Sequence, residues 1–129
     1  MIDVLQTAAA WLEGRRASHM SGLVHYLRGA ERIVLAATIA HSDHERIDAA
    51  GIVETVRTTD FLVPTANLVL AGEPIVPERG DRIEREDAAE RTTQIYEVLA
   101  PAGGVVYRTE NRGQTLRIHT KRLDAEATP

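Results

Sequence analysis

The sequence contains no cysteine and very few aromatic side chains. Without cysteine the chain cannot form disulfides, thiolate zinc sites or a thiol nucleophile, and this absence is typical of a reducing, intracellular compartment. Only 4% of the residues are aromatic, which argues against a platform on which nucleic-acid bases stack. The net charge of −4 also argues against a protein whose whole surface binds nucleic acid. Any chemistry must therefore come from oxygen and nitrogen side chains.

The sequence also lacks a long apolar run and a basic leader. Its most apolar stretch, residues 33–40, is less than half as long as a membrane span. The first residues lack the positive start of a secretory signal, so we expect no targeting segment and no membrane partner. A length of 129 residues with 43% hydrophobic content suits a single folded domain over residues 1–129.

The hydrophobic pattern changes its period between residues 14 and 22. Apolar side chains recur at helical spacing after Asp3, which predicts an amphipathic helix over residues 3–17. Such a helix would either cover the open end of a sheet or dock its apolar stripe on another subunit. After residue 22 the pattern alternates with a period of two, which predicts strands.

Turn residues divide this alternating region into short strands. The pattern predicts a first hairpin from residues 23–27 and 33–40, a third strand over residues 52–63, and a last hairpin from residues 105–108 and 116–123. We therefore expect a mainly β fold, a small antiparallel barrel or sandwich over residues 22–123 with one N-terminal helix.

Three polar stretches are predicted to lie outside the strands. Residues 41–50 are interpreted as a polar connection. Prolines and a run of acids predict a mobile loop over residues 72–93 that is available to contact a partner, and its part 84–93 is expected to be solvated. The tail, residues 124–129, is expected to be frayed.

Residues that carry catalysis or bind metals are poorly arranged in this sequence. His41 and His44 are the best metal candidates, but their spacing of three differs from the helical spacing of four that aims two rings at one ion. Ser occurs only at positions 18, 21 and 42, none of them in a Gly-x-Ser-x-Gly setting. The carboxylate pairs lack the apolar surroundings that raise a pKa for acid catalysis. We therefore predict no enzyme, no metal site and no cofactor.

A set of motifs in the C-terminal part of the chain is more specific. In chain order these are Phe61-Leu62-Val63, Asn67-Leu68, Pro77-Glu78-Arg79-Gly80-Asp81-Arg82-Ile83, Tyr96-Glu97-Val98-Leu99 and Leu116-Arg117-Ile118-His119-Thr120-Lys121-Arg122. This order resembles the small head-to-tail joining proteins of tailed bacteriophages and prophages. Their middle part reads as a Pro-x-x-Gly-Asp-x-Ile turn and strand followed by a Tyr-x-Val strand. The resemblance covers about residues 51–123.

The resemblance implies a non-enzymatic virion protein at the head–tail junction, made in the cytoplasm of a bacterial host. It would assemble as a ring beneath the portal, in a head-closure or connector role that seals the filled head and offers the tail a binding surface. The implied partners are other copies of the chain, portal or adaptor proteins and tail proteins. DNA would only pass through the channel of the ring.

The central motif also has a physical explanation. Gly80 allows a positive φ, so that Asp81 can accept backbone N–H bonds while Ile83 enters the core. This structural turn occurs in many small barrels and by itself predicts only a barrel.

Two charged segments are candidates for an interface. One is the polar loop, whose candidate residues are Glu84, Arg85, Glu86, Asp87 and Glu90. The other is the last strand, where alternation places Arg117, His119 and Lys121 on one face. These three side chains either pair within the domain, with Glu97 or Glu54 as candidate partners, or contact a portal protein or the acidic loop of the next copy.

Two other classes of function are weighed against this one. The main alternative is a small bacterial β-barrel module that binds a ligand or a protein partner. Such a module needs a concave face with aromatic side chains, and the few aromatics here are dispersed. A small hydrolase would need a convergent polar cluster, which the sequence does not reveal.

Overall fold

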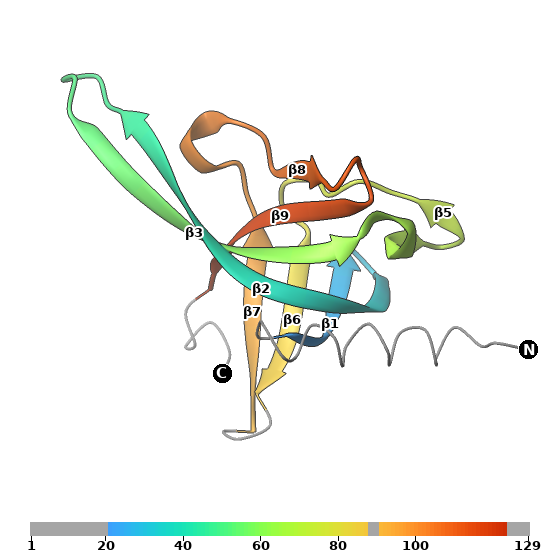
Figure 1. Cartoon of the computed structure of the whole chain (residues 1–129). Helices are drawn as coiled ribbons and strands as arrows, with labels where there is room; N and C mark the ends of the chain where they lie inside the picture. Colours follow the sequence, from blue (N-terminus) through green and yellow to red (C-terminus); the bar gives the residue numbers. More distant parts are fainter. Residues whose placement is uncertain (1–20, 88–90, 124–129) are drawn as a thin grey trace, which may run out of the picture.

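The computed structural model describes residues 21–87 and 91–123 of the chain (Figure 1). The predicted helix over residues 3–17, the predicted tail over residues 124–129 and Glu90 lie outside the described residues. The main strands are β1 (Ser21–Arg28), β2 (Glu31–Ile47), β3 (Val53–Pro64), β6 (Arg82–Asp87), β7 (Thr92–Val98), β8 (Tyr107–Glu110) and β9 (Thr115–Arg122). The short elements are β4 (Val69–Leu70), β5 (Glu73–Pro74) and the 3₁₀ turns η1 (Thr65–Asn67) and η2 (Pro101–Gly103).

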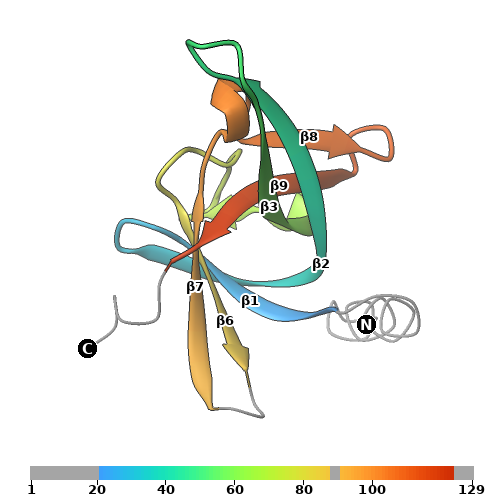
Figure 2. The ribbon, with the colours of Figure 1, turned by 90° about the vertical axis from the view of Figure 1, so that its left-hand side faces the viewer.

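Six antiparallel strands close into a barrel. They follow the order β3-β2-β1-β6-β7-β9, and β9 pairs back with β3 between Thr59↔Thr120 and Pro64↔Thr115. Strand β8 adds to the same edge of β9 that β7 uses further along, as Figures 1 and 2 show. The prediction of a mainly β fold is confirmed, and the closing β3–β9 pair makes it a barrel rather than a sandwich. Within the described residues no helix is long and apolar enough to cross a membrane.

The core fills the interior of this barrel. Every barrel strand contributes side chains at alternate positions, as expected for strands with one face inward. The fully buried members include Tyr26, Phe61, Ile83, Val98 and Ile118. The rings of Phe61 and Tyr96 meet edge to face with their centroids 4.9 Å apart, a favoured aromatic geometry.

Strand β2 is longer than the sequence predicted. The interpretation of residues 41–50 as a connection is wrong for residues 41–47, which continue β2 and pair with β3 as far as Ile47↔Val53. Beyond the barrel this two-stranded segment projects into solvent on both faces (Figures 1 and 2). Neither face is buried, so its strands need no apolar alternation, and the polar sequence concealed the β2 half. The β3 half lies within the strand predicted over residues 52–63. We call residues 43–57 the arm.

A second hairpin lies where the sequence predicted a loop. The prediction of an irregular loop over residues 84–93 is wrong for residues 84–87 and 92–93, which extend β6 and β7 and pair from Glu84↔Ile95 to Asp87↔Thr92. The reason is the same as in the arm, because this hairpin runs past the end of the core. We call its described residues, 84–87 and 91–94, the acidic hairpin. It points away from the arm, toward the opposite end of the molecule in both views (Figures 1 and 2).

Candidate functional site

The Gly-Asp turn binds the start of β6 to β1. Gly80 has a φ of +95°, and the Asp81 carboxylate is 5% exposed. That carboxylate accepts hydrogen bonds from the backbone N–H of Glu78 at 3.0 Å and from the Tyr26 hydroxyl. Arg28 donates to it twice, from Nε at 3.0 Å and from Nη2 at 2.8 Å. A single carboxylate therefore holds a turn, a buried phenol and a guanidinium together.

This arrangement fixes the protonation of its members. Burial, and after it the hydrogen bond to Asp81, raises the pKa of Tyr26, so the phenol stays protonated and donates. The hydrogen bond to Asp81 also raises the pKa of Arg28, which remains a cation. Sequence reasoning located Gly80 and Asp81 but missed these two partners on β1. Ile83, two residues after Asp81, is fully buried in the core.

A second buried carboxylate lies on the outward face of β3. Asp60 is fully buried, and four side chains donate to it or contact it. Thr58 Oγ1 donates at 2.7 Å and Arg117 Nε at 2.7 Å, His119 Nδ1 lies 3.0 Å from the carboxylate, and the Ser42 hydroxyl also donates. Strands β2, β3 and β9 thus converge on one charge. We call these five residues the Asp60 cluster.

The chain between β7 and β8 covers this cluster. The N–H of Leu99 donates to the His119 carbonyl at 3.1 Å, and the His119 N–H donates to the Val106 carbonyl at 2.9 Å. Between these anchors η2 packs against β2 and β3, with Pro101 buried. An outward side chain such as His119 is therefore only 2% exposed.

The cluster keeps Asp60 ionised. Burial alone would raise the pKa of Asp60, but the hydrogen bonds from His119, Ser42, Thr58 and Arg117 outweigh it and hold the pKa well below its usual range. Ser42 bonds the carboxylate rather than an imidazole, so it lacks the neighbouring base that activates a serine nucleophile. The arrangement is that of a structural clamp across three strands.

His41 and His44 do not come together in the structure. Residues three apart on a strand point to opposite faces, so these two rings diverge. The His44 ring packs edge to face on His119 with centroids 4.8 Å apart, and its Nε2 lies 3.2 Å from Thr58 Oγ1. Burial, and after it the charge of His119, lowers the pKa of His44. Among residues 21–87 and 91–123 no group of three His, Asp or Glu side chains could hold a metal ion.

The three predicted cations of the last strand lie on one face of β9 but differ in their exposure to solvent. His119 is buried and the Arg117 side chain is 16% exposed, and both pair within the domain, which is one of the two alternatives weighed for this strand. Their carboxylate is Asp60, not Glu97 or Glu54, and Arg117 also lies 3.5 Å from Glu110. The sequence pattern could not reveal this, because the covering segment arrives from elsewhere in the chain.

Lys121 is exposed and belongs to a row of charges across the outside of the barrel. The strand register aligns outward positions of β2, β1, β6, β7 and β9 in one row, whose members are Arg32, Leu27, Arg82, Glu97 and Lys121. Arg32 reaches Glu84 in the neighbouring row at 3.3 Å. We call Arg32, Arg82 and Lys121 the cation row.

The remaining predicted interface residues lie on β6. Outward positions alternate from Arg82 at the cation row to Glu84 and then Glu86 in the acidic hairpin, so the charge changes sign along one face. Arg85 donates to Gln94 Oε1 at 3.4 Å within the hairpin. Asp87 ends β6.

The chain matches the model of one protein family. The model describes a phage head-tail joining protein, and the match covers residues 2–127, nearly the whole sequence. No curated protein matches the chain. The matched family consists of structural, non-enzymatic proteins of the virion's head–tail junction, and its extent agrees with the motifs of β3, β6, β7 and β9. The chain therefore belongs to the phage head-tail joining protein family.

Proposed function

We propose that the chain assembles as a ring at the head–tail junction, in a head-closure or connector role, and joins a portal or adaptor protein on one side to a tail protein on the other. The observation that carries the finer part of this proposal is the polarity of the barrel's outer face. A protein that joins two different partners needs two different surfaces, and the cation row and the acidic hairpin are opposite in charge.

In this proposal each of the two charged surfaces binds a different partner. Lys121, at one end of the cation row, meets a partner surface rich in carboxylates, while Glu84, Glu86, Asp87 and Glu90 meet a basic one. Arg85, the partly buried Arg117 and the buried His119 bind no partner directly but hold the hairpin and β9 in place. Complementary charges of this kind set which partner binds and how fast, and they add little to folding.

The channel of such a ring would carry DNA without reading its sequence. The aromatic content of only 4% and the overall charge of −4 both favour passage over tight binding. The alternative, a barrel that binds a small ligand inside, has no support in the interior. Buried side chains, among them Tyr26, Phe61 and Ile118, occupy it.

The test is a deletion of the gene in the phage or prophage that encodes it. Negative-stain images of the lysate should show heads and free tails that accumulate separately, and a plasmid copy of the wild-type gene should restore joined particles. A lysate of normally joined virions from the deletion strain would overturn the proposal.

A further inference from the structure

The arm ends in an exposed apolar tip. Ile47, Ile52 and Val53 are 69%, 60% and 55% exposed, and they surround the turn between β2 and β3. The turn itself is well bonded, because Asp48 Oδ1 accepts the N–H of Ala50 at 2.8 Å and that of Ile52 at 2.9 Å. An ordered hairpin that offers three large aliphatic side chains to water is characteristic of a contact surface.

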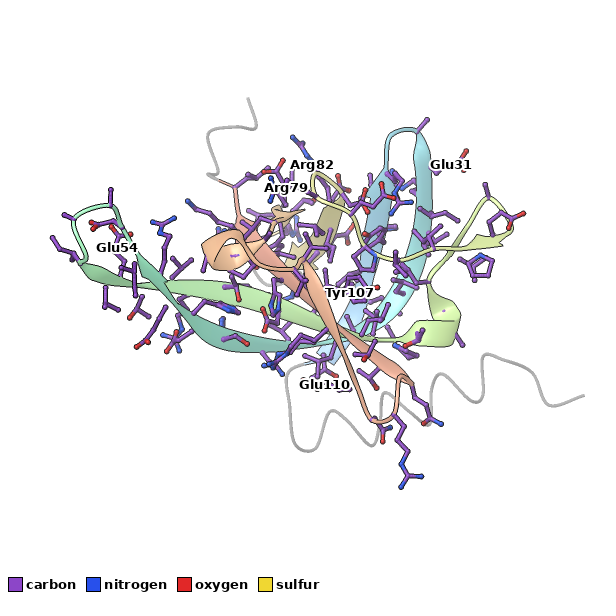
Figure 3. The ribbon with its side chains drawn as sticks, turned by 90° about the horizontal axis from the view of Figure 1, so that it is seen from above. Glu31, Glu54, Arg79, Arg82, Tyr107 and Glu110 are labelled. Atoms are coloured by element: carbon purple, nitrogen blue, oxygen red, sulfur yellow. The ribbon has the colours of Figure 1, made fainter. Side chains whose placement is uncertain are left out.

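Side-chain contacts attach the base of the arm to the barrel and join its two strands. At its base Arg117 donates from Nε to Ser42 Oγ at 3.2 Å and from Nη2 to the His41 carbonyl at 3.4 Å. Further out, ion pairs join the two strands, Arg46 to Glu54 at 2.5 Å and Arg57 to Asp43 at 3.7 Å. Figure 3 shows Glu54 on the arm, well away from the body of the barrel.

The arm is also acidic overall. Its two arginines are both paired across the strands, and its acids outnumber them, since it carries Asp43, Glu45, Asp48 and Glu54. A fitting partner surface is therefore apolar in its centre and basic at its margin.

The same chain carries such a surface on its outer face. Leu23 on β1 is 60% exposed and Val34 on β2 is 57% exposed, and both point outward beside one another, since Leu23 pairs with Ala36 and His25 pairs with Val34. The cation row borders this patch, because Arg32 lies two residues before Val34 on the same face of β2. We call Leu23 and Val34 the receiving patch.

We propose that the arm tip of one copy packs on the receiving patch of the next copy. The contact rests on the proposed ring and names the surfaces that build it. Tip and patch are different regions of one chain, so each copy gives one contact and receives another, and such a heterologous interface closes into a ring when the rotation between copies allows it. The acids of the arm then lie against Arg32 and Arg82 of the neighbour.

The arm tip of one copy cannot reach the receiving patch of the same copy. Ala36, the register partner of Leu23, lies about 35 Å along β2 from Ile47. Both views place the tip far from β1 (Figures 1 and 2). Any link between tip and patch must therefore join two molecules.

The absence of cysteine makes a direct cross-linking test possible. The full chain with Leu23→Cys and Ile52→Cys is supplied to the deletion strain, and filled heads that carry it are treated with a short bismaleimide. The expected result is a ladder of covalent multimers of the chain. Each single variant, and the matched pair Leu23→Cys with Val105→Cys, should give no ladder, because Val105 is equally exposed at 65% but lies outside the arm.

Other outcomes overturn the inference without touching the proposed function. A cross-link from position 52 to a head or tail protein would show that the tip binds that partner instead. Joined particles without any ladder would show that the ring uses other surfaces. A cysteine at position 23 that fails to react with a small maleimide in the free protein would show that the patch is covered by the chain's own residues. Failure of the proposed function itself appears separately, as joined virions in the deletion strain.

Discussion

The barrel contains two buried aspartates that are held in different ways. Asp81 sits in a turn and takes its donors from that turn and from neighbouring β1, and its guanidinium partner, Arg28, keeps 30% of its side chain in water. Asp60 sits on the outward face, under a covering segment, and its donors come from three strands. Its partners Arg117 and His119 are 16% and 2% exposed.

The difference concerns what each carboxylate holds together. Loss of the Asp81 charge leaves Arg28 with access to solvent and the turn with its own backbone bonds, such as Val98 N–H to the Asp81 carbonyl at 2.8 Å. Loss of the Asp60 charge leaves buried donors on β2, β3 and β9 without an acceptor. Solvent access, more than the number of hydrogen bonds, decides the cost of removal.

The largest effect is expected for Asp60→Asn. An amide cannot balance the charge of Arg117 and places its own N–H groups among donors, so the free energy of unfolding should fall by about 3–5 kcal/mol. Chemical denaturation measures this. Asp43→Asn is the matched control, because Asp43 is 64% exposed and its pair with Arg57 spans 3.7 Å. Equal stability of Asp60→Asn and Asp43→Asn would show that the buried carboxylate is no more important for folding than an exposed one.

A smaller loss is expected for Asp81→Asn. The amide oxygen can still accept from Tyr26 and from the Glu78 N–H, and Arg28 can turn to water, so we expect about 1–3 kcal/mol by the same measurement. Tyr26→Phe removes one donor and leaves the others, and should cost about 1 kcal/mol. The idea that solvent access separates the two sites is wrong if Asp81→Asn proves costlier than Asp60→Asn.

The pH dependence sharpens the contrast, because only the Asp60 cluster adjoins a histidine whose pKa is lowered. His44 titrates near 6.5 in the unfolded chain and lower in the folded one. Below pH 6.5 the unfolded state therefore binds a proton that the folded state resists, and stability falls as the pH falls. Urea unfolding at pH 7 and pH 5 should show this decrease, and His44→Gln should reduce it. His41→Gln serves as the control, and an equal reduction there would assign the effect elsewhere.

The smallest effect on folding is expected in the exposed cation row. Lys121→Glu should change the free energy of unfolding by less than about 1 kcal/mol, since exposed ion pairs contribute little. It should nevertheless reduce the fraction of joined particles in the complementation assay. Arg112→Glu, an exposed arginine in the turn before β9, is the control and should join normally. Arg117→Ala should instead melt markedly lower, because its partner Asp60 is buried.

The two aspartates also show which contacts can be predicted from the sequence and which cannot. The turn around Asp81 is local, because Gly80 and the backbone of Glu78 stand beside it in the chain, and so the turn was predictable. Its partners Tyr26 and Arg28, 55 and 53 residues away, were not. The Asp60 partners Ser42, Arg117 and His119 are separated from it by 18, 57 and 59 residues. No spacing rule connects such positions, and only the closed barrel brings them together.

The extent of the strands shows a similar limit. Alternation located the strand segments that line the core, such as residues 33–40, because one of their faces is buried. It failed for residues 41–47 and 84–87, where a strand outside the barrel has both faces in water and carries polar residues on each. The barrel body and the β3 half of the arm were therefore predictable from the sequence, whereas the β2 half of the arm and the strand ends that form the acidic hairpin were not.

The Arg117 clamp at the base of the arm has a mechanical consequence. Ile47 lies about 16 Å from Ser42 along β2, so a force on the tip acts on the base of the arm over that distance. At that base the load is shared by the β2–β3 ladder, which continues from the arm into the barrel, and by Arg117, which ties the His41 carbonyl and Ser42 to Asp60. Through Arg117 part of the force reaches β9, the strand that also closes the barrel through β3 and β7. A neighbour that displaces the tip therefore also loads the strand pairs that close the barrel.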